Sequence, residues 1–151
     1  MTVVEPFTTA AQDQDVPWAI LAGGNRTGGL VTFGQTHLSP RSPGPSRHVH
    51  THEDEAVFVF SGVLTVEVGD RRIEAAPHSL TWLPRHVPHT FANLSDEDLW
   101  ALVVITPAGL EEMFEALDRY LAGLDGPPDP GVIMELNERY GVRRVDGPPL
   151  I

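Results

Sequence analysis

Residues 47–55 read RHVHTHEDE and hold three histidines and three carboxylates, with one arginine as the only fixed positive charge. Such a stretch is either a solvated polar turn or one edge of a metal site. A single histidine is more often an ordinary surface or core residue, but clustering favours the metal site. Imidazole and carboxylate together suit Fe²⁺, Mn²⁺, Co²⁺, Ni²⁺ or Zn²⁺, so the pattern predicts one divalent transition metal per chain without choosing among them.

Strand geometry decides which side chains share a face. His48 and His50 are two positions apart in an expected strand, so both imidazoles project to the same side. Four residues separate His50 from Glu55, which is enough for the chain to turn and begin an antiparallel neighbour. His89 begins another expected strand, at residues 89–94, and is a further candidate ligand.

The elements that position these residues are short and β-like. Apolar or alternating runs recur about every ten residues, with turn residues between them, and this spacing predicts a sandwich or barrel. Residues 23–29 (GGNRTGG) are expected to form a loop, and three prolines make residues 39–46 a rigid loop. The expected strands cover residues 16–22, 30–38, 55–62, 63–68, 71–76, 80–84, 89–94 and 98–106.

The period changes to that of a helix after residue 106. A first helix is expected from a Thr106 cap and Pro107 to a glycine at 123 or 126, and a second from an Asp129 cap to Gly141. Residues 142–151 are expected to be extended. The predicted organisation is therefore a flexible N-terminus (1–15), a β-barrel (16–106) and a helical extension packed on it (107–151).

Composition narrows the possible partners. A length of 151 residues suits one domain, and a net charge of −11 argues against nucleic acid and anionic membranes as partners. The chain has no cysteine, which excludes disulfides, thiolate metal sites and thiol nucleophiles. It shows no signal peptide and no apolar run of about 18 residues, so we expect a cytoplasmic protein.

Two separated motifs resemble those of the cupin superfamily. In the first, His48-Val49-His50 is followed by four residues, Glu55, six residues and Gly62. In the second, Pro84 and His86 precede His89 and Asn93 at the spacing of Pro-x-Gly, two residues, His, three residues, Asn. The resemblance implies an all-β cupin (jelly-roll, or double-stranded β-helix) barrel with one or two C-terminal helices. It also implies that the metal ligands are His48, His50, Glu55 and His89.

This sequence departs from the motifs at three glycine positions, which are occupied by Ser42, His78 and His86. A turn of this kind often needs positive φ, and histidine adopts that conformation more readily than most residues, so we interpret His86 as a turn residue rather than a ligand. We expect His52 to face solvent, although a role beside the site stays open. Glu53 and Asp54 miss the motif spacing and are expected to be turn carboxylates.

The chain also resembles small quercetinase-like cupins of bacteria, through AGGNRTGG (22–29), the gap between His50 and Glu55, and the segments PAGLEEMFEAL (107–117) and ELNERYGVRRV (135–145). That likeness implies a homodimeric dioxygenase that acts with O₂ on a flavonol-like or other enolisable aromatic or polyketide substrate. Glu55 would then be both ligand and general base, with a raised pKa. The alternatives are a zinc cyclase or isomerase of natural-product biosynthesis and a non-catalytic cupin that binds a metal or small ligand.

Strand parity predicts the walls of the substrate pocket. In a strand, side chains an even number of positions from an inward-facing ligand point to the same face. This rule places Val57 and Val59 on the face of Glu55, and Phe91 on the face of His89. Two further aromatics are candidates whose facing the pattern does not fix. For any single one of the five residues, a place in an ordinary core is the better interpretation. The predicted substrate-binding residues are Phe33, Val57, Val59, Trp82 and Phe91.

Overall fold

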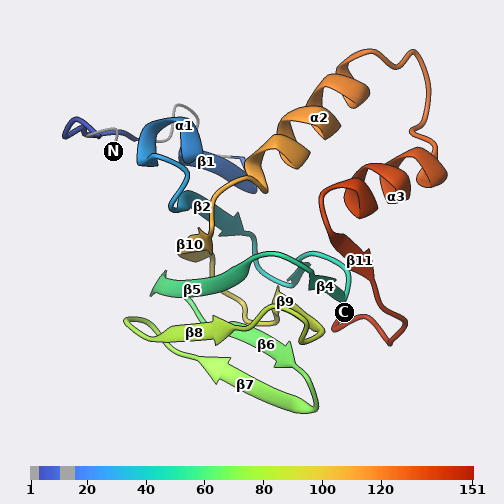
Figure 1. The fold of residues 1–151 in the computed structure, drawn as a ribbon. Helices are drawn as coiled ribbons and strands as arrows, with labels where there is room; N and C mark the ends of the chain where they lie inside the picture. Colours follow the sequence, from blue (N-terminus) through green and yellow to red (C-terminus); the bar gives the residue numbers. More distant parts are fainter. Residues whose placement is uncertain (1–3, 11–15) are drawn as a thin grey trace.

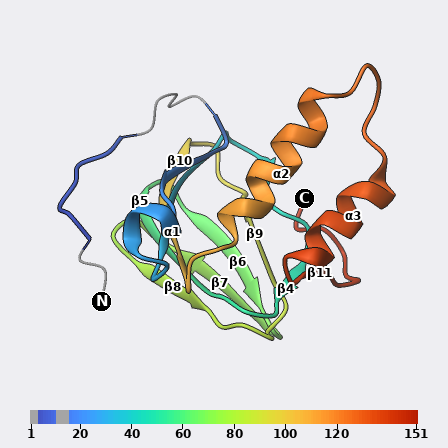
Figure 2. The ribbon, with the colours of Figure 1, turned by 45° about the horizontal axis from the view of Figure 1, so that its top comes forward.

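The computed structural model describes residues 4–10 and 16–151, so the predicted flexible N-terminus lies partly outside the described residues. Two antiparallel sheets face each other, and the two longer helices lie together at one end of them (Figures 1 and 2). The predicted all-β jelly-roll with C-terminal helices is confirmed. Among the described residues, no helix is long and apolar enough to cross a bilayer.

One sheet has the strand order β1-β2-β10-β5-β8 and the other β11-β4-β9-β6-β7, with β3 beside β9. The first sheet contains β1 (Trp18–Ala22), β2 (Thr32–Leu38), β10 (Leu99–Thr106), β5 (Asp54–Ser61) and β8 (Leu80–Leu83). The second contains β11 (Val142–Arg144), β4 (His48–His50), β9 (His89–Asn93), β6 (Leu64–Val68), β7 (Arg71–Ala75) and β3 (Ser42–Pro43). The helices are α1 (Gly24–Thr27), α2 (Glu111–Ala122) and α3 (Pro130–Arg139).

Alternation along the strands produces the core. Every second side chain of β10 is buried, and β5 sends Val57 and Val59 inward with no exposed surface. The β6–β7 hairpin turns at Gly69-Asp70, the two residues between the strands expected at 63–68 and 71–76, with Val68 opposite Arg71 and Gly69 at φ +56°. Apolar side chains from both sheets therefore meet in one core, and the ligand strands β4, β5 and β9 are held at its edge.

The outer face of β5 and β8 is also apolar. Phe60, Leu80 and Trp82 are 49%, 61% and 49% exposed, and Phe58 lies opposite Leu80 across the strand pair. An apolar face of this kind is normally covered, and the candidates for the cover are the C-terminal helices, the N-terminal strand and a second subunit. The two longer helices lie at the other end of the barrel and β1 extends the same sheet, so neither of these covers it.

Two expectations about local structure are wrong. Residues 24–27 form one helical turn, α1, because Gly28 at φ +67° closes it and Glu111 accepts a hydrogen bond from the Gly24 N–H. The first long helix begins at Glu111 rather than after a Thr106 cap. Thr106 is the last residue of β10, and its hydroxyl donates to the Leu30 carbonyl at 3.0 Å.

The second long helix begins as predicted. Asp129 caps it by accepting a hydrogen bond from the Gly131 N–H at 2.8 Å, and Pro130 is its first residue. Gly141, at φ +78°, then turns the chain into β11, which pairs with β4. The chain thus returns from the helices directly to the strand that carries two predicted metal ligands.

Candidate metal centre

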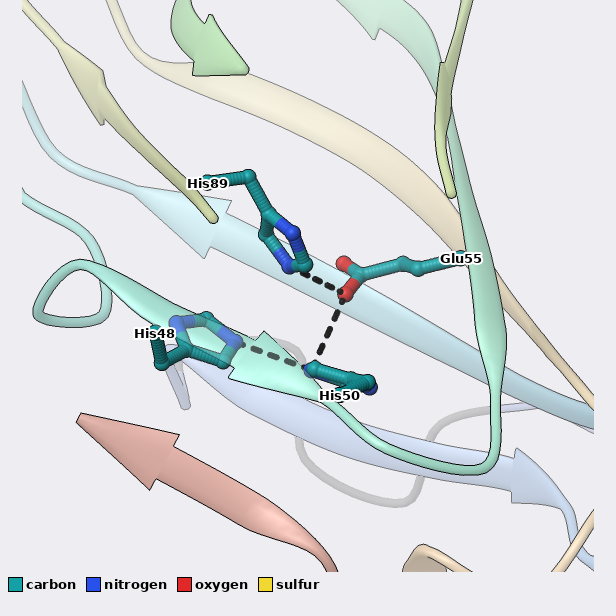
Figure 3. A group of neighbouring side chains, drawn as sticks. All are labelled: His48, His50, Glu55 and His89. Atoms are coloured by element: carbon teal, nitrogen blue, oxygen red, sulfur yellow. Dashed lines mark hydrogen bonds and ion pairs between the residues drawn. The ribbon is translucent and has the colours of Figure 1, made fainter. Parts of the chain in front are cut away.

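The four predicted ligands converge on one point. Each of His48, His50, Glu55 and His89 offers an atom that lies within 4.8 Å of the others (Figure 3). The Glu55 Oε2 atom is 3.7 Å from His50 Nε2 and 3.5 Å from His89 Nε2. The Nε2 atoms of His48 and His50 are 2.9 Å apart.

Neighbouring strands bring the four side chains together. His48 on β4 is the register partner of His89 on β9, so their side chains lie on the same face of one sheet. Glu55 comes from β5 in the opposite sheet and reaches across to them (Figure 3). The centre therefore bridges the two sheets.

Backbone carbonyls orient two of the imidazoles. The Nδ1–H of His48 donates to the Ser46 carbonyl at 2.7 Å, and that of His89 donates to the Val87 carbonyl at 3.0 Å. Because a neutral imidazole carries one proton, each bond leaves the Nε2 lone pair free and directed at the centre. This is the tautomer that a metal ligand requires.

The third imidazole has a different neighbour. His50 Nδ1 lies 3.9 Å from the Glu53 Oε2 atom, and His50 and Glu53 are only 3% and 6% exposed. Neither atom has a hydrogen-bond partner within the described residues. Glu53 lies in the turn between β4 and β5, as expected, but the sequence did not predict that it would be buried behind a candidate ligand.

Electrostatics keep the donor set ready for a cation. Burial lowers the pKa of His48 and lowers that of His50 to about 4, so both imidazoles are neutral at neutral pH. Burial raises the pKa of Glu55, but the His89 contact and the nearby imidazoles outweigh it, and the net pKa is below its ordinary value. The carboxylate is thus ionised.

This donor set fits a divalent transition metal. Three imidazoles and one carboxylate are suitable ligands, and the buried His89 Nε2 atom has no hydrogen-bond partner within the described residues. A cation would satisfy that nitrogen and the charge of Glu55 together. The residues do not distinguish iron, manganese, cobalt, nickel and zinc.

A cavity of about 850 Å³ opens from the centre toward α2 and α3. His48, His50 and Glu55 lie in its wall. Most other lining side chains are apolar, and this size and character are typical of small-molecule sites. The barrel and the helices contribute, among others, Trp18, Leu38, Phe91, Val103, Ile105, Met113, Phe114, Leu117, Ile133, Met134 and Val142.

Comparison with known proteins agrees with this geometry. Residues 34–105 match the Cupin domain family. A cupin protein from Bacteroides fragilis has a similar structure, with a TM-score of 0.57 and 17% identity over 85% of this chain and 93% of that one. The structural likeness shows that the barrel has the cupin fold, and the family match covers residues 34–105 within it.

Other proteins have higher sequence identity to this chain but cover less of it. A structure from Thermus thermophilus has 26% identity and a TM-score of 0.50, over 52% of this chain and 74% of that one. A sugar phosphate isomerase of the cupin superfamily from Silicibacter pomeroyi has 26% identity and a TM-score of 0.51, over 60% and 59%. An uncharacterized Streptomyces coelicolor protein is 40% identical over 55 residues, 36% of this chain, and the match spans about half of that relative, 51%.

The remaining polar candidates lie away from the cupin centre. His52 is exposed, as expected. His86 and His78 occupy glycine positions of the motif at φ +65° and +66°, which confirms His86 as a turn residue. Asp54 accepts a hydrogen bond from Arg85 at 2.8 Å, outside the donor set.

The predicted pocket walls are partly wrong. Phe91 lines the cavity, whereas Val57 and Val59 belong to the core of the cupin barrel and do not line it. Phe33 alternates with the buried Thr32 and Gly34 and so faces outward, and Trp82 is 49% exposed on the outer face. Neither aromatic side chain reaches the cavity.

Sequence reasoning missed the contribution of the C-terminal segment. β11 places Val142 opposite His50 and Arg144 opposite His48, and both residues line the cavity. Apolar residues of α2 and α3 form its other side. Their helical period was a visible signal, but it did not show that the helices would stand over the cupin centre.

Proposed function

We propose that this chain is a metal-dependent dioxygenase that acts on a flavonol-like or other enolisable aromatic or polyketide substrate. The observation that carries the proposal is a cluster of three imidazoles and one carboxylate, of which His48, His50 and Glu55 lie in the wall of a large, mainly apolar cavity. A bound divalent ion would supply Lewis acidity and, if redox-active, access to O₂ chemistry.

The cavity suits a flat, apolar molecule. Trp18 and Phe114 have ring centroids 5.1 Å apart, and both line the space between the barrel and α2. Aromatic walls of this kind bury aromatic rings and exclude water from the region above the centre. The helices thus favour a substrate with an extended ring system.

Glu55 is the residue we assign as general base. Its position among the three imidazoles places its Oε2 atom where a hydroxyl directed at the centre would meet it. The raised pKa expected from the sequence is not found, because the imidazoles hold the net pKa of Glu55 below its ordinary value. A weak base removes protons efficiently only from acidic hydroxyls, which favours enols and phenols over aliphatic alcohols.

Oxygen uptake tests the proposal directly. Protein loaded separately with Fe²⁺, Mn²⁺, Co²⁺, Ni²⁺ or Zn²⁺ is mixed with quercetin in an oxygen electrode, and the product is identified by mass spectrometry. We expect O₂ consumption with at least one redox-active metal and its loss in Glu55→Gln. Activity of no redox-active form, in samples shown to hold metal, would overturn the dioxygenase.

A redox-silent isomerase or cyclase is the second candidate. The sugar phosphate isomerase from Silicibacter pomeroyi, at 26% identity, favours it. The same Glu55 would move a proton between substrate atoms without net oxidation. Turnover by the zinc form without O₂ uptake would support this candidate, whereas tight binding without turnover would indicate a non-catalytic cupin.

We also propose that the chain forms a homodimer. The exposed apolar face formed by Phe58, Phe60, Leu80 and Trp82 lies on and beside β8, the edge strand of its sheet. Pairing of two such faces would bury these side chains in a homodimer. Sedimentation of the parent chain and of Leu80→Glu tests it: we expect a dimer that becomes a monomer.

A further inference from the structure

Arg144 is an exposed residue of the edge strand β11 that contributes to the cavity wall beside the site. It is the register partner of His48 in the antiparallel pair β4–β11, and directly opposite residues project from the same face of a sheet. Opposite Cβ atoms in such a pair are about 5 Å apart, so the arginine stem starts beside a candidate metal ligand. Arg144 indeed lines the cavity, whereas the adjacent Arg143 points to the other face and does not.

The guanidinium of Arg144 is free to meet a ligand. Six of the ten arginines make ion pairs with carboxylates, but within the described residues Arg144 has no carboxylate within 4.0 Å. Across the part of the chain that the structure describes, it is the one arginine or lysine in the cavity wall. An unpaired cation there stands out in a chain with a net charge of −11.

The other charged groups of the cavity wall set the direction of selectivity. Glu55 is committed to the imidazoles, and Glu138 of α3 lies at the exposed rim, beyond ion-pair distance of Arg144. The cavity therefore has a negative group at the metal centre, a positive group beside it and apolar surface between the barrel and the helices. This arrangement complements a ligand with an anionic group on an apolar body.

We propose that the substrate carries a carboxylate or phosphate group that pairs with Arg144 while its apolar body fills the space under α2 and α3. The planar guanidinium presents two parallel N–H donors that match either oxyanion. The inference rests on the proposed function for the end of the substrate that faces the metal centre, but the anion subsite itself depends only on Arg144.

Matched probes test the subsite. The probes are 3-hydroxyflavone and its 4′-carboxylate and 4′-phosphate derivatives, which differ only in the anionic group. Their dissociation constants for the Co²⁺-loaded protein are measured from the absorption and fluorescence of the flavonol, at low and high salt. The proteins are the parent chain, Arg144→Ala, Arg144→Lys and the control Arg143→Ala, whose charge change is identical.

We expect at least one anionic probe to bind the parent chain about tenfold more tightly than the neutral one. That advantage should vanish in Arg144→Ala, persist in part in Arg144→Lys and remain in Arg143→Ala. Whichever derivative shows the larger advantage identifies the oxyanion. Equal affinity of all three probes for the parent, or an advantage that survives Arg144→Ala, overturns the subsite.

The same data separate the subsite from the proposed function. Arg144-dependent binding of an anionic probe, with no binding of 3-hydroxyflavone, supports the subsite and contradicts a flavonol-like substrate. Binding of 3-hydroxyflavone that perturbs the Co²⁺ absorption bands, without an anionic advantage, supports the proposed function and overturns the subsite. Binding of none of the probes overturns both.

Discussion

Removal of the Glu53 carboxylate is expected to weaken metal binding without weakening the metal-free fold. A metal on Nε2 of His50 requires the proton on Nδ1, and Glu53 Oε2, at 3.9 Å, is the acceptor that faces it. A movement of about 1 Å would bring the pair to the length of a charge-assisted hydrogen bond. Carbonyls already serve this purpose for His48 and His89.

The expected loss of metal affinity follows from the energy of the hydrogen bond between Glu53 and His50. A hydrogen bond to a charged group contributes about 1.5–3 kcal/mol, which corresponds to about 10- to 150-fold in affinity. Loss of such a partner to a ligating histidine typically costs about 10–100-fold in metal affinity. We therefore expect Glu53→Gln to bind metal about 10–100-fold more weakly than the parent chain.

The metal-free protein should respond in the opposite direction. Burial raises the pKa of Glu53, and without a metal its Oε2 atom has no hydrogen-bond partner within the described residues. Replacing an unsatisfied buried carboxylate by a neutral amide should leave unfolding stability unchanged or increase it. A side chain with only a structural role would not show opposite changes in stability and metal affinity.

The assay is zinc competition with a chromophoric chelator, combined with thermal unfolding of the metal-free protein. Asp54→Asn is the matched control, because this neighbouring carboxylate pairs with Arg85 and lies outside the donor set. NMR of the zinc form should show a protected Nδ1–H on His50 that disappears in Glu53→Ala. Zinc affinities of Glu53→Gln and Asp54→Asn that agree within about twofold would refute the reasoning.

Three further predictions concern single residues. His89→Ala should abolish most metal occupancy, whereas exposed His52→Ala should retain it; equal loss by elemental analysis would contradict the ligand assignment. Burial raises the pKa of Glu111, but hydrogen bonds outweigh it and the net pKa lies below its ordinary 4.5. The ionised Glu111 therefore stabilises the fold fully above pH 4.5, and this stabilisation is lost as the pH falls through the lowered pKa. The melting temperature of Glu111→Gln should accordingly fall less on acidification than that of the parent chain. Melting temperatures that fall in parallel for the two proteins would contradict this. His86→Gly should raise the free energy of unfolding by about 1 kcal/mol by relieving a φ of +65°, without loss of metal; a decrease in urea titrations would refute the strain.

Local geometry made much of the centre predictable. The two-residue spacing of His48 and His50 fixes a common face, and the second motif placed His89 on a neighbouring strand. The Asp129 cap and the Gly69-Asp70 hairpin are likewise determined by residues close in sequence. These features need no knowledge of how distant segments pack.

The sequence-based predictions fail where contacts between residues far apart in the sequence determine the local structure. α2 begins at Glu111 because that carboxylate bonds with Gly24 and Thr32, which are far away in sequence. In β2 the inward face carries Thr32 and Thr36 while Phe33 faces outward, so the facing of this strand cannot be derived from its hydrophobic residues. The burial of Glu53 depends on the path of the turn between β4 and β5, which the spacing of charged residues does not reveal.

The strand β11 has an evolutionary consequence. The candidate metal ligands all fall within residues 34–105, the segment that matches the cupin family, whereas Val142 and Arg144 come from beyond it. The proposed anion subsite is thus encoded in a different stretch of the gene from the candidate metal ligands. Under this proposal, a chimera that exchanges only residues 107–151 with a relative should keep its metal affinity and inherit the relative's preference for or against anionic ligands.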